Sequence, residues 1–313
     1  MVANGSGPAF GERVEYGPDD VCYRHPSTHS FTLCQRCGRT ICSECQVVSA
    51  VGVLCPECVK QTQPGAAKRA ARSARVTGRR VAALDTPVTY AIVAVNLVVF
   101  VLQLLGRYFF SDEVTRALWY MPIYSVPESV SSQLFSDVGF EPWRMLTATF
   151  THSTGFLLHI LFNMYALWLF GRNLEQLMGR VQFLVLYLFA GLGGSLAVML
   201  WVYADPSTLI VPTVGASGAI FGVLGATVVA FRSAGANVAS LIALIAINFG
   251  IGLLPGANIS WQAHLGGMIV GALTMWLLVS NRGPRKRTQR IVSLVVLGAV
   301  LVAMCFAYFA VLP

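Results

Sequence analysis

Long apolar stretches recur along this sequence, and they constrain the chain to fold within a membrane. A helix needs about 20 mostly apolar residues to cross the hydrocarbon core of a bilayer. Only 12% of the 313 residues are charged, whereas soluble domains have about 25%. We predict seven transmembrane helices, at residues 88–108, 150–170, 181–203, 215–231, 237–254, 261–280 and 291–311.

The distribution of basic residues predicts the orientation of these helices, because Lys and Arg collect in loops on the cytoplasmic side. The basic positions expected inside are the N-terminal region, Arg172, Arg180, Arg232 and residues 281–290. The loops expected outside are 109–149, 204–214 and 255–260. We therefore expect a multi-pass protein of the cell membrane with a cytoplasmic N-terminus and an external C-terminus. Its formal net charge of +8 is expected to face the lipid bilayer rather than nucleic acid.

Changes in composition along the chain predict five regions. They are a disordered N-terminus at 1–20, a Cys/His module at 21–61, a basic juxtamembrane linker at 62–84, a six-helix membrane core at 85–281, and a basic loop with a seventh helix at 282–313. The linker is expected to lie on an anionic membrane surface. The alternative for this segment is a solvated spacer.

The Cys/His module has the residue types and spacing of a metal site. The first residues lack the apolar core of a signal peptide, so we expect the module in a reducing cytosol, where cysteine clusters bind metal rather than form disulfides. Eight ligands suffice for two tetrahedral zinc sites, and zinc would supply the folding energy of so small a unit. The pairs are Cys22 and His25, Cys34 and Cys37, Cys42 and Cys45, and Cys55 and Cys58.

The spacing of these pairs resembles a B-box-type zinc finger. The resemblance implies interleaved ligation, in which the first and third pairs bind one ion and the second and fourth pairs bind the other. The sequence alone also allows sequential pairing, and His29 is a spare candidate ligand. We expect both ions to be structural. Because the module is tethered to a membrane, we expect it to contact a cytosolic protein rather than DNA.

Polar side chains inside the predicted spans are the candidate functional residues, because such groups are costly in a membrane. They are His152, His159 and Asn163 in the second span, Ser217 in the fourth, Asn248 in the fifth and His264 in the sixth. His159 and Asn163 are four residues apart and share a helix face. The predicted orientation places His159, Ser217 and His264 near the outer ends of their spans, so we expect them to converge. The alternative for any single histidine is a packing role.

Ser217 is a candidate nucleophile. A serine hydroxyl needs a base to remove its proton, and either His264 or His159 could serve. No Asp or Glu lies in any predicted span from the second onward, so a hydrolase of this kind must work as a Ser–His dyad. The backbone N–H of Ser217 at a helix N-terminus, with His159 and Asn163, could stabilise an oxyanion.

Glycines around the serine predict how the helices pack. Gly215 allows a tight turn before the serine, and Phe221, one turn after it, is a candidate platform for the histidine. The segments 218–222 (GAIFG) and 267–271 (GMIVG) are small-xxx-small motifs, which permit close helix contact in lipid. If the fourth and sixth spans pack through these faces, the serine meets the histidine of the sixth span. The alternative is helix packing without chemistry.

Four short motifs together resemble those of the rhomboid intramembrane serine proteases. They are WR at 143–144, HILFN at 159–163, GASG at 215–218 and AHLGG at 263–267. The resemblance covers residues 85–281 in order and spacing. It implies an all-α polytopic membrane protein, with a rhomboid-like six-helix bundle to which this chain adds one C-terminal transmembrane helix and the small N-terminal zinc-binding module.

The resemblance also implies roles for individual residues. Ser217 would be the nucleophile and His264 the general base, whereas His159, Asn163 and the Ser217 N–H would form the oxyanion hole. Trp143 and Arg144 would belong to a structural element of the first external loop. Phe221 stands where the family often has Tyr, which removes a hydroxyl but keeps the ring.

The expected function is that of an intramembrane serine endopeptidase. It would cleave transmembrane segments of membrane proteins near the outer face through an acyl-enzyme, with no cofactor for the chemistry. One alternative is a catalytically silent relative that binds membrane clients and uses the zinc module as an adaptor. A transporter predicts inverted repeats, which the sequence lacks. A metal bound by the intramembrane histidines is a further alternative.

Overall fold

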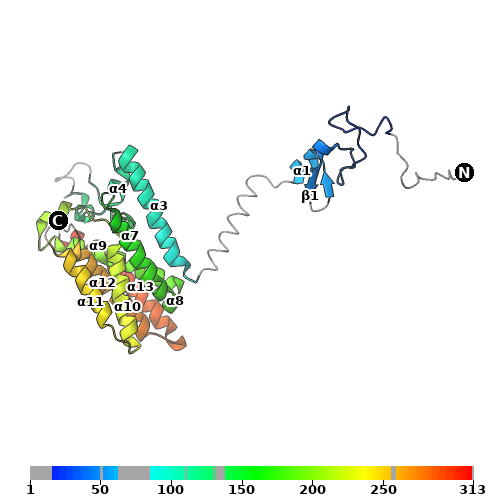
Figure 1. Ribbon diagram of the computed structural model, residues 1–313. Coiled ribbons are helices and arrows are strands. Elements are labelled where there is room, and N and C mark those ends of the chain that lie inside the picture. The colour runs from blue at the N-terminus through cyan, green and yellow to red at the C-terminus, as the bar shows by residue number, and fades with distance from the viewer. Residues whose placement is uncertain are drawn as a thin grey trace. The chain divides into compact units, whose positions relative to one another are not determined.

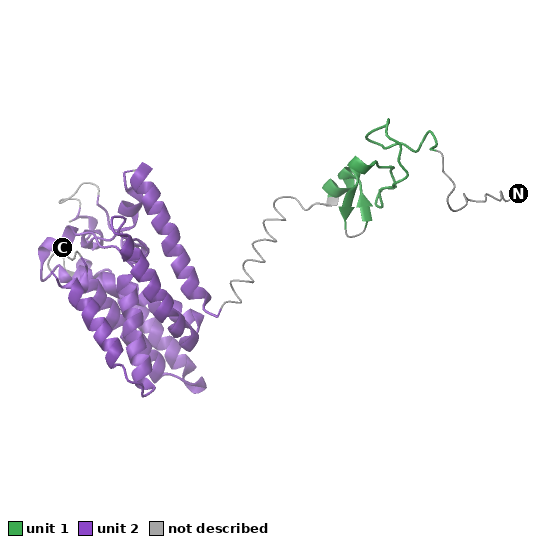
Figure 2. Cartoon of the chain, in the orientation of Figure 1, with its two compact units in different colours: residues 1–82 green, residues 83–313 purple. Residues whose placement is uncertain are grey.

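The computed structural model describes residues 16–49, 52–62, 85–109, 111–129, 131, 138–254 and 259–311. The chain divides into two compact units, residues 1–82 and 83–313, and each is described by itself (Figure 2). The predictions for the N-terminus at 1–15 and for the linker at 63–84 lie outside the described residues. Residues 16–20 belonged to the predicted disordered terminus, but Tyr16 stacks on the rings of His29 and Phe31.

The first unit is built around its cysteines. An antiparallel hairpin pairs β1 (Val47–Ser49) with β2 (Gly52–Leu54), and the helix α1 (Pro56–Thr62) follows. The buried cluster contains six cysteines, and its only other buried members among the described residues are Ile41 and Leu54. So small an apolar core is insufficient to hold a domain together.

The second unit is a bundle of helices (Figure 1). Its α-helices are α3 (Pro87–Phe109), α4 (Glu113–Leu118), α6 (Arg144–Thr147), α7 (Leu157–Ala166), α8 (Arg172–Met178), α9 (Arg180–Trp201), α10 (Ser217–Ser233), α11 (Ala239–Gly252), α12 (Trp261–Ser280), α13 (Arg287–Met304) and α14 (Ala307–Val311). Short 3-10 helices join them: η2 (Pro122–Ser125), η3 (Ala148–Phe150), η5 (Pro206–Ile210) and η6 (Pro284–Lys286). The segment η4 (Leu167–Gly171) is a π-helix.

Several of these helices are long and apolar enough to cross a membrane, namely Pro87–Phe109, Arg180–Trp201, Trp261–Ser280 and Pro284–Met304, and α10 and α11 are shorter apolar helices. Many of their large apolar side chains are exposed, as a lipid-facing surface requires. The predicted fold class, an all-α polytopic membrane protein with a small N-terminal module, is confirmed.

The second predicted span differs from the structure. We expected a helix over 150–170, but the helix begins at Leu157 and runs through α7, η4 and α8 to Met178. The preceding backbone is held by the side chain of Gln103, which accepts a hydrogen bond from the His152 N–H and donates one to the His152 carbonyl, both at 2.9 Å. Arg172, expected in a loop, therefore lies on a helix.

The predicted external loop at 109–149 contains short helices that pack against the bundle. Arg144 holds this loop together: its guanidinium pairs with Glu141, donates to the Arg116 carbonyl and lies 4.2 Å from the ring centre of Tyr124. Its neighbour Trp143 is exposed. The C-terminal helices also reach this loop, because Phe140 packs against Phe306 and Phe309.

Glycines bring α10 and α12 into backbone contact, as the small-xxx-small motifs predicted. A Cβ at Gly267 would lie 2.0 Å from the Gly218 carbonyl oxygen, and one at Gly271 would lie 2.2 Å from the Gly222 carbonyl oxygen. Gly222 is equally confined, with Ala190 of α9 on its other side. Only glycine allows this approach.

We expect Gly267→Ala to destabilise the bundle by about 3 kcal/mol, because overpacking against backbone cannot be relieved by a rotamer change. The same substitution should reduce activity, since α12 carries His264. Thermal unfolding in detergent measures the first effect. The matched control is Gly250→Ala on α11, where nothing lies within 4 Å of the added carbon. Equal melting temperatures for the two variants would contradict the packing argument.

A buried carboxylate joins two distant helices at one end of the bundle. Glu175 on α8 is 2% exposed and accepts hydrogen bonds from the backbone N–H groups of Val88 and Thr89 and from the Thr89 hydroxyl, at 2.7–2.9 Å. These N–H groups belong to the first turn of α3, and the N–H groups of a first turn have no acceptor within their own helix. Glu175 thus acts as a helix cap across 86 residues of sequence.

Replacing Glu175 with Gln should lower the free energy of unfolding by about 2 kcal/mol, the typical contribution of hydrogen bonds to a charged group. An amide N–H₂ would then face backbone donors. Asp205→Asn is the control, because Asp205 caps the short helix η5 through an exposed hydrogen bond. A loss for Glu175→Gln no larger than that for Asp205→Asn would show that the buried cap contributes little.

Candidate active site

The structure brings Ser217 and His264 together. Ser217 begins α10 and His264 lies in the first turn of α12, and the two helices start at the same end of the bundle because α11 returns the chain between them. The His264 Nε2 lies 2.9 Å from the Ser217 Oγ, which is hydrogen-bonding distance. This is the distance at which an imidazole can take a proton from a serine hydroxyl.

Packing rather than a carboxylate orients His264. The ring is 5% exposed and stacks on Phe221, with ring centres 4.1 Å apart and planes at 10°. Its Nδ1 is buried and has no hydrogen-bond partner among the described residues. The geometry is therefore that of a dyad without a third member.

The loop before Ser217 is fixed by backbone hydrogen bonds. Tyr120 and Thr213 exchange a pair of them, and the Gly215 N–H donates to the Ala148 carbonyl at 3.0 Å. Gly215 has a φ of +125°, which disfavours other residues. The first N–H groups of a helix have no partner within it, so α10 presents a dipole and free donors at the serine.

His159 points its Nε2 toward this loop. A Cβ at Gly215 would lie 3.1 Å from that nitrogen, so glycine also makes room for the ring. The His159 Nδ1 lies 3.3 Å from the Ser153 N–H, which donates to it. A neutral imidazole that accepts at Nδ1 carries its proton on Nε2, so His159 presents a donor beside Ser217.

Asn163 is placed differently from the expectation. It lies one turn after His159 on the same face, but its side-chain N–H donates to the His159 carbonyl of its own helix at 2.7 Å. No contact between its amide and Ser217 is formed within the part of the chain that the structure describes. One N–H of the amide remains for another acceptor.

The remaining intramembrane polar residues fall into two groups. His152 is fully buried, its ring lies 5.3 Å from that of His159, and neither of its ring nitrogens has a partner among the described residues. Asn248 is exposed on α11 and donates to the Leu244 carbonyl, away from the serine. His152 therefore borders the site, whereas Asn248 does not belong to it.

Residues beyond the predicted ones also support the site. Gln103 fixes the backbone at His152, and Tyr120 and Ala148 fix the loop before Ser217. Gln103 could have been found, because it is a polar residue within a predicted span. Tyr120 and Ala148 act through their backbone, which leaves no signal in the sequence.

The cysteines of the first unit form two clusters that could hold metal ions. Cys22, His25, Cys42 and Cys45 form one, and Cys34, Cys37, Cys55 and Cys58 form the other; within each, all ligand atoms lie within 4.8 Å of one another. The grouping is interleaved along the chain. His29 is not in either cluster and stacks on Tyr16 instead.

The interatomic distances suit a tetrahedral ion. Zinc–sulfur bonds of about 2.3 Å place two tetrahedral sulfurs about 3.8 Å apart. The Cys37 and Cys55 sulfurs are 3.8 Å apart, and the His25 Nδ1 lies 3.3 and 3.4 Å from the sulfurs of Cys42 and Cys45.

The shifted pKa values of the cysteine thiols are also compatible with a bound cation in each cluster. Burial acts to raise the pKa of Cys34, but backbone N–H groups donate to its sulfur and lower the pKa to about 6. Burial and the adjacent thiols raise the pKa of Cys58 to about 12 and that of Cys45 to about 11. A bound divalent ion would offset the repulsion that keeps these thiols protonated.

Comparison with known proteins shows what part of the membrane unit is similar to. The family model for the Rhomboid domain matches residues 139–281. "Rhomboid protease GluP" of Bacillus subtilis is 38% identical over 139 residues, which are 42% of this chain and 25% of that protein. "Rhomboid protease AarA" of Providencia stuartii is 29% identical over 192 residues, 53% of this chain and 66% of that protein. "RHOMBOID-like protein 4" of Arabidopsis thaliana is 33% identical over 148 residues, which are 45% of this chain and 35% of that protein. The matched segments thus span less than two thirds of these relatives.

Proposed function

Because residues 139–281 match the family model for the Rhomboid domain, we propose that this membrane protein is an intramembrane serine endopeptidase. The observation that carries the proposal is the 2.9 Å contact between the His264 Nε2 and the Ser217 Oγ. The named bacterial relatives are rhomboid proteases, which supports a protease at the level of the family.

In the proposed reaction, the Ser217 Oγ attacks the scissile carbonyl carbon while its proton passes to the His264 Nε2. The negative charge that develops on the carbonyl oxygen is stabilised by the Ser217 N–H and by the Nε2–H of His159. His264 then protonates the leaving amine, and an acyl-enzyme remains on Ser217. His264 next removes a proton from water, which releases the acid and restores the hydroxyl.

Asn163 is the weaker member of the proposed oxyanion hole. One of its N–H groups bonds the His159 carbonyl, so its contribution requires the second N–H or a rotation of the side chain. His159 needs no such rotation in this proposal, because its ring already borders Gly215, as the Ser217 hydroxyl does.

The substrate class follows from the position of the dyad in a membrane helix bundle. We expect transmembrane segments of other membrane proteins to be cut near the outer face, after local unwinding exposes a peptide bond. The expected orientation, with the N-terminus in the cytoplasm, follows from the basic residues.

The two cysteine clusters are proposed to hold structural zinc. The ligands would be Cys22, His25, Cys42 and Cys45 for one ion, and Cys34, Cys37, Cys55 and Cys58 for the other. Bound zinc would supply folding energy to the first unit and take no part in proteolysis. A cytosolic protein partner for this unit stays a prediction.

The experiment that tests the protease is cleavage of single-span model substrates by the purified full chain in liposomes. Wild type should release two fragments from at least one substrate, and Ser217→Ala should release none. The control is Asn248→Ala, which removes an intramembrane polar group outside the site. If wild type binds these substrates but cuts them no faster than Ser217→Ala does, the adaptor function replaces the protease.

A further inference from the structure

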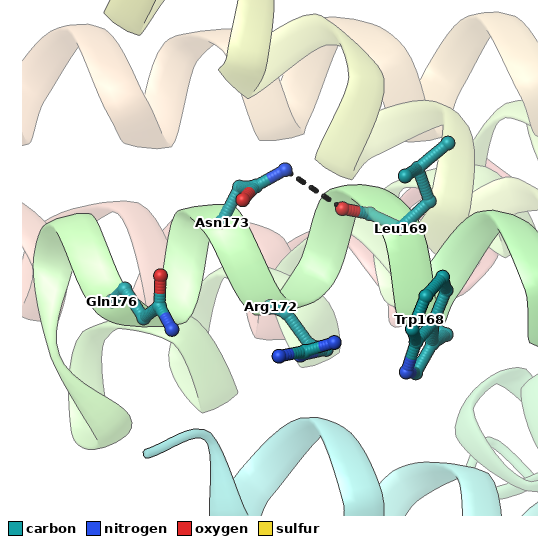
Figure 3. Close-up of a pocket in the computed structure, with 5 residues that line it drawn as sticks. All are labelled: Trp168, Leu169, Arg172, Asn173 and Gln176. Carbon is teal, nitrogen blue, oxygen red and sulfur yellow. Dashed lines mark hydrogen bonds between the residues drawn. The ribbon is translucent and has the colours of Figure 1, made fainter.

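A polar pocket lies on the membrane unit, far from the serine. It has a volume of about 140 Å³ and is lined by Trp168, Leu169, Arg172, Asn173 and Gln176 (Figure 3). Arg172 follows His159 by 13 positions on the continuous helix of α7, η4 and α8. At 1.5 Å per residue this is about 20 Å along the helix, so the pocket is separate from the proposed active site.

The lining side chains present donors on one side of the helix. Trp168, Arg172 and Gln176 are spaced four residues apart, and Figure 3 shows Trp168 and Arg172 on the side that faces the ribbon of α3. Asn173 lies on the other side, where its amide donates to the Leu169 carbonyl at 2.9 Å. The π-helix η4 ends directly before Arg172, and such segments often occur at functional sites.

Arg172 is a cation with unmet hydrogen-bonding capacity. Its Nε is buried and has no hydrogen-bond partner among the described residues. The guanidinium lies 5.1 Å from the ring centre of Trp168 and 5.9 Å from that of Tyr90 on α3. These rings hold the cation in place but accept no conventional hydrogen bond from it.

Within the described part of the chain, no ion pair of this cation with a carboxylate is found. Glu175, one turn away, is 2% exposed, and both of its oxygens accept hydrogen bonds from Val88 and Thr89. The ion pairs Arg39–Glu57 and Arg144–Glu141 do not involve Arg172. The linker is no source either, because its sequence contains no Asp or Glu between Glu57 and Asp85.

We infer that this pocket binds a phosphate group, with the Arg172 guanidinium as the main ligand and the Gln176 amide and Trp168 indole N–H as further donors. Guanidinium matches phosphate in charge and in planar, two-pronged geometry. The flanking Trp and Tyr are residue types enriched at membrane interfaces. A phospholipid headgroup and a free phosphate share this chemistry, and the experiment distinguishes them.

The test uses the full chain in detergent, with the melting temperature and native mass spectrometry as readouts. The probes are phosphatidylglycerol, phosphatidylcholine and inorganic phosphate. Phosphatidylglycerol should stabilise wild type saturably, and Arg172→Gln should raise the concentration needed by at least tenfold. Arg172→Lys should need a phosphatidylglycerol concentration between those of wild type and Arg172→Gln, because it keeps the charge but loses the planar guanidinium.

The matched control is Arg232→Gln, which removes an exposed charge from the last turn of α10 outside the pocket. It should bind phosphatidylglycerol as wild type does. If both Gln variants weaken binding equally, or if neither does, the pocket is not the site and the inference fails. Saturable stabilisation by inorganic phosphate that Arg172→Gln abolishes would support the pocket and assign it to a soluble phosphate.

Lipid-free melting temperatures control for folding. Arg172→Gln and Arg232→Gln should unfold within a few degrees of wild type without added lipid. Should Arg172→Gln fail to fold, Gln176→Ala, which removes an exposed amide from the same pocket, takes its place with an expected loss of about threefold. Failure here leaves the protease proposal intact, because none of these residues contacts the dyad.

Discussion

Ser217→Ala and His264→Ala should each lower kcat for cleavage of a transmembrane substrate by roughly 10⁴-fold or more, with little change in substrate binding. The first variant removes the nucleophile and the second removes the group that takes its proton. In serine hydrolases, loss of either member typically costs that much. Cleavage in proteoliposomes at saturating substrate measures kcat, and co-purification of substrate measures binding.

The double variant should be no slower than the slower single variant. Residues that act as one unit are strongly non-additive, because the second loss removes a function that the first has already disabled. The control for imidazole packing is Phe221→Leu, which removes the stacked ring but keeps the dyad, and we expect a loss nearer tenfold. Full activity in His264→Ala would require another base, and His159 would then be the candidate.

Removal of metal should unfold the first unit and leave the second folded. The buried cluster of the first unit consists mainly of cysteines, so its folding depends on ligand bonds rather than on apolar burial. Structural zinc contributes about 10–16 kcal/mol in small metal-binding peptides, which exceeds what such a core supplies. Amide hydrogen exchange after chelation should show lost protection in residues 21–61 and retained protection in residues 85–281.

The stoichiometry of metal tests the interleaved arrangement. Elemental analysis should find two ions in wild type and about one in Cys34→Ser, which disables a single cluster. Cys305→Ser is the control, because Cys305 is a buried free cysteine of the membrane unit. Retention of two ions by Cys34→Ser, or full exchange protection after chelation, would contradict the metal assignment.

The local sequence was sufficient to predict most of the membrane helices and to single out the candidate residues of the site. A bilayer requires long apolar helices, so composition alone located α3, α9 and α12 to within a few residues. Ser217 and His264 were found because polar residues in an apolar span are rare enough to stand out. The glycine motifs then predicted the contact that joins their helices, since close approach needs residues without side chains.

Tertiary structure decided what depends on partners distant in sequence. The helix of the second span begins at Leu157 because Gln103, about 50 residues earlier, satisfies the backbone at His152. The Glu175 cap joins groups 86 residues apart. Neither contact can be predicted from the local pattern of apolar and polar residues.

The same division applies to the two candidate sites. Cysteine spacing established four ligand pairs, but which pairs lie together depends on how the hairpin and α1 fold back on the earlier loops, and the structure groups them in alternation. The sequence placed Asn163 on the face of His159, whereas the structure directs its amide to its own helix. The sequence determined which residues can react or bind a ligand, because residue type fixes the hydrogen-bond donors, acceptors and charges that each one has. Only the fold decided which atoms those residues meet, because side-chain direction depends on packing between helices.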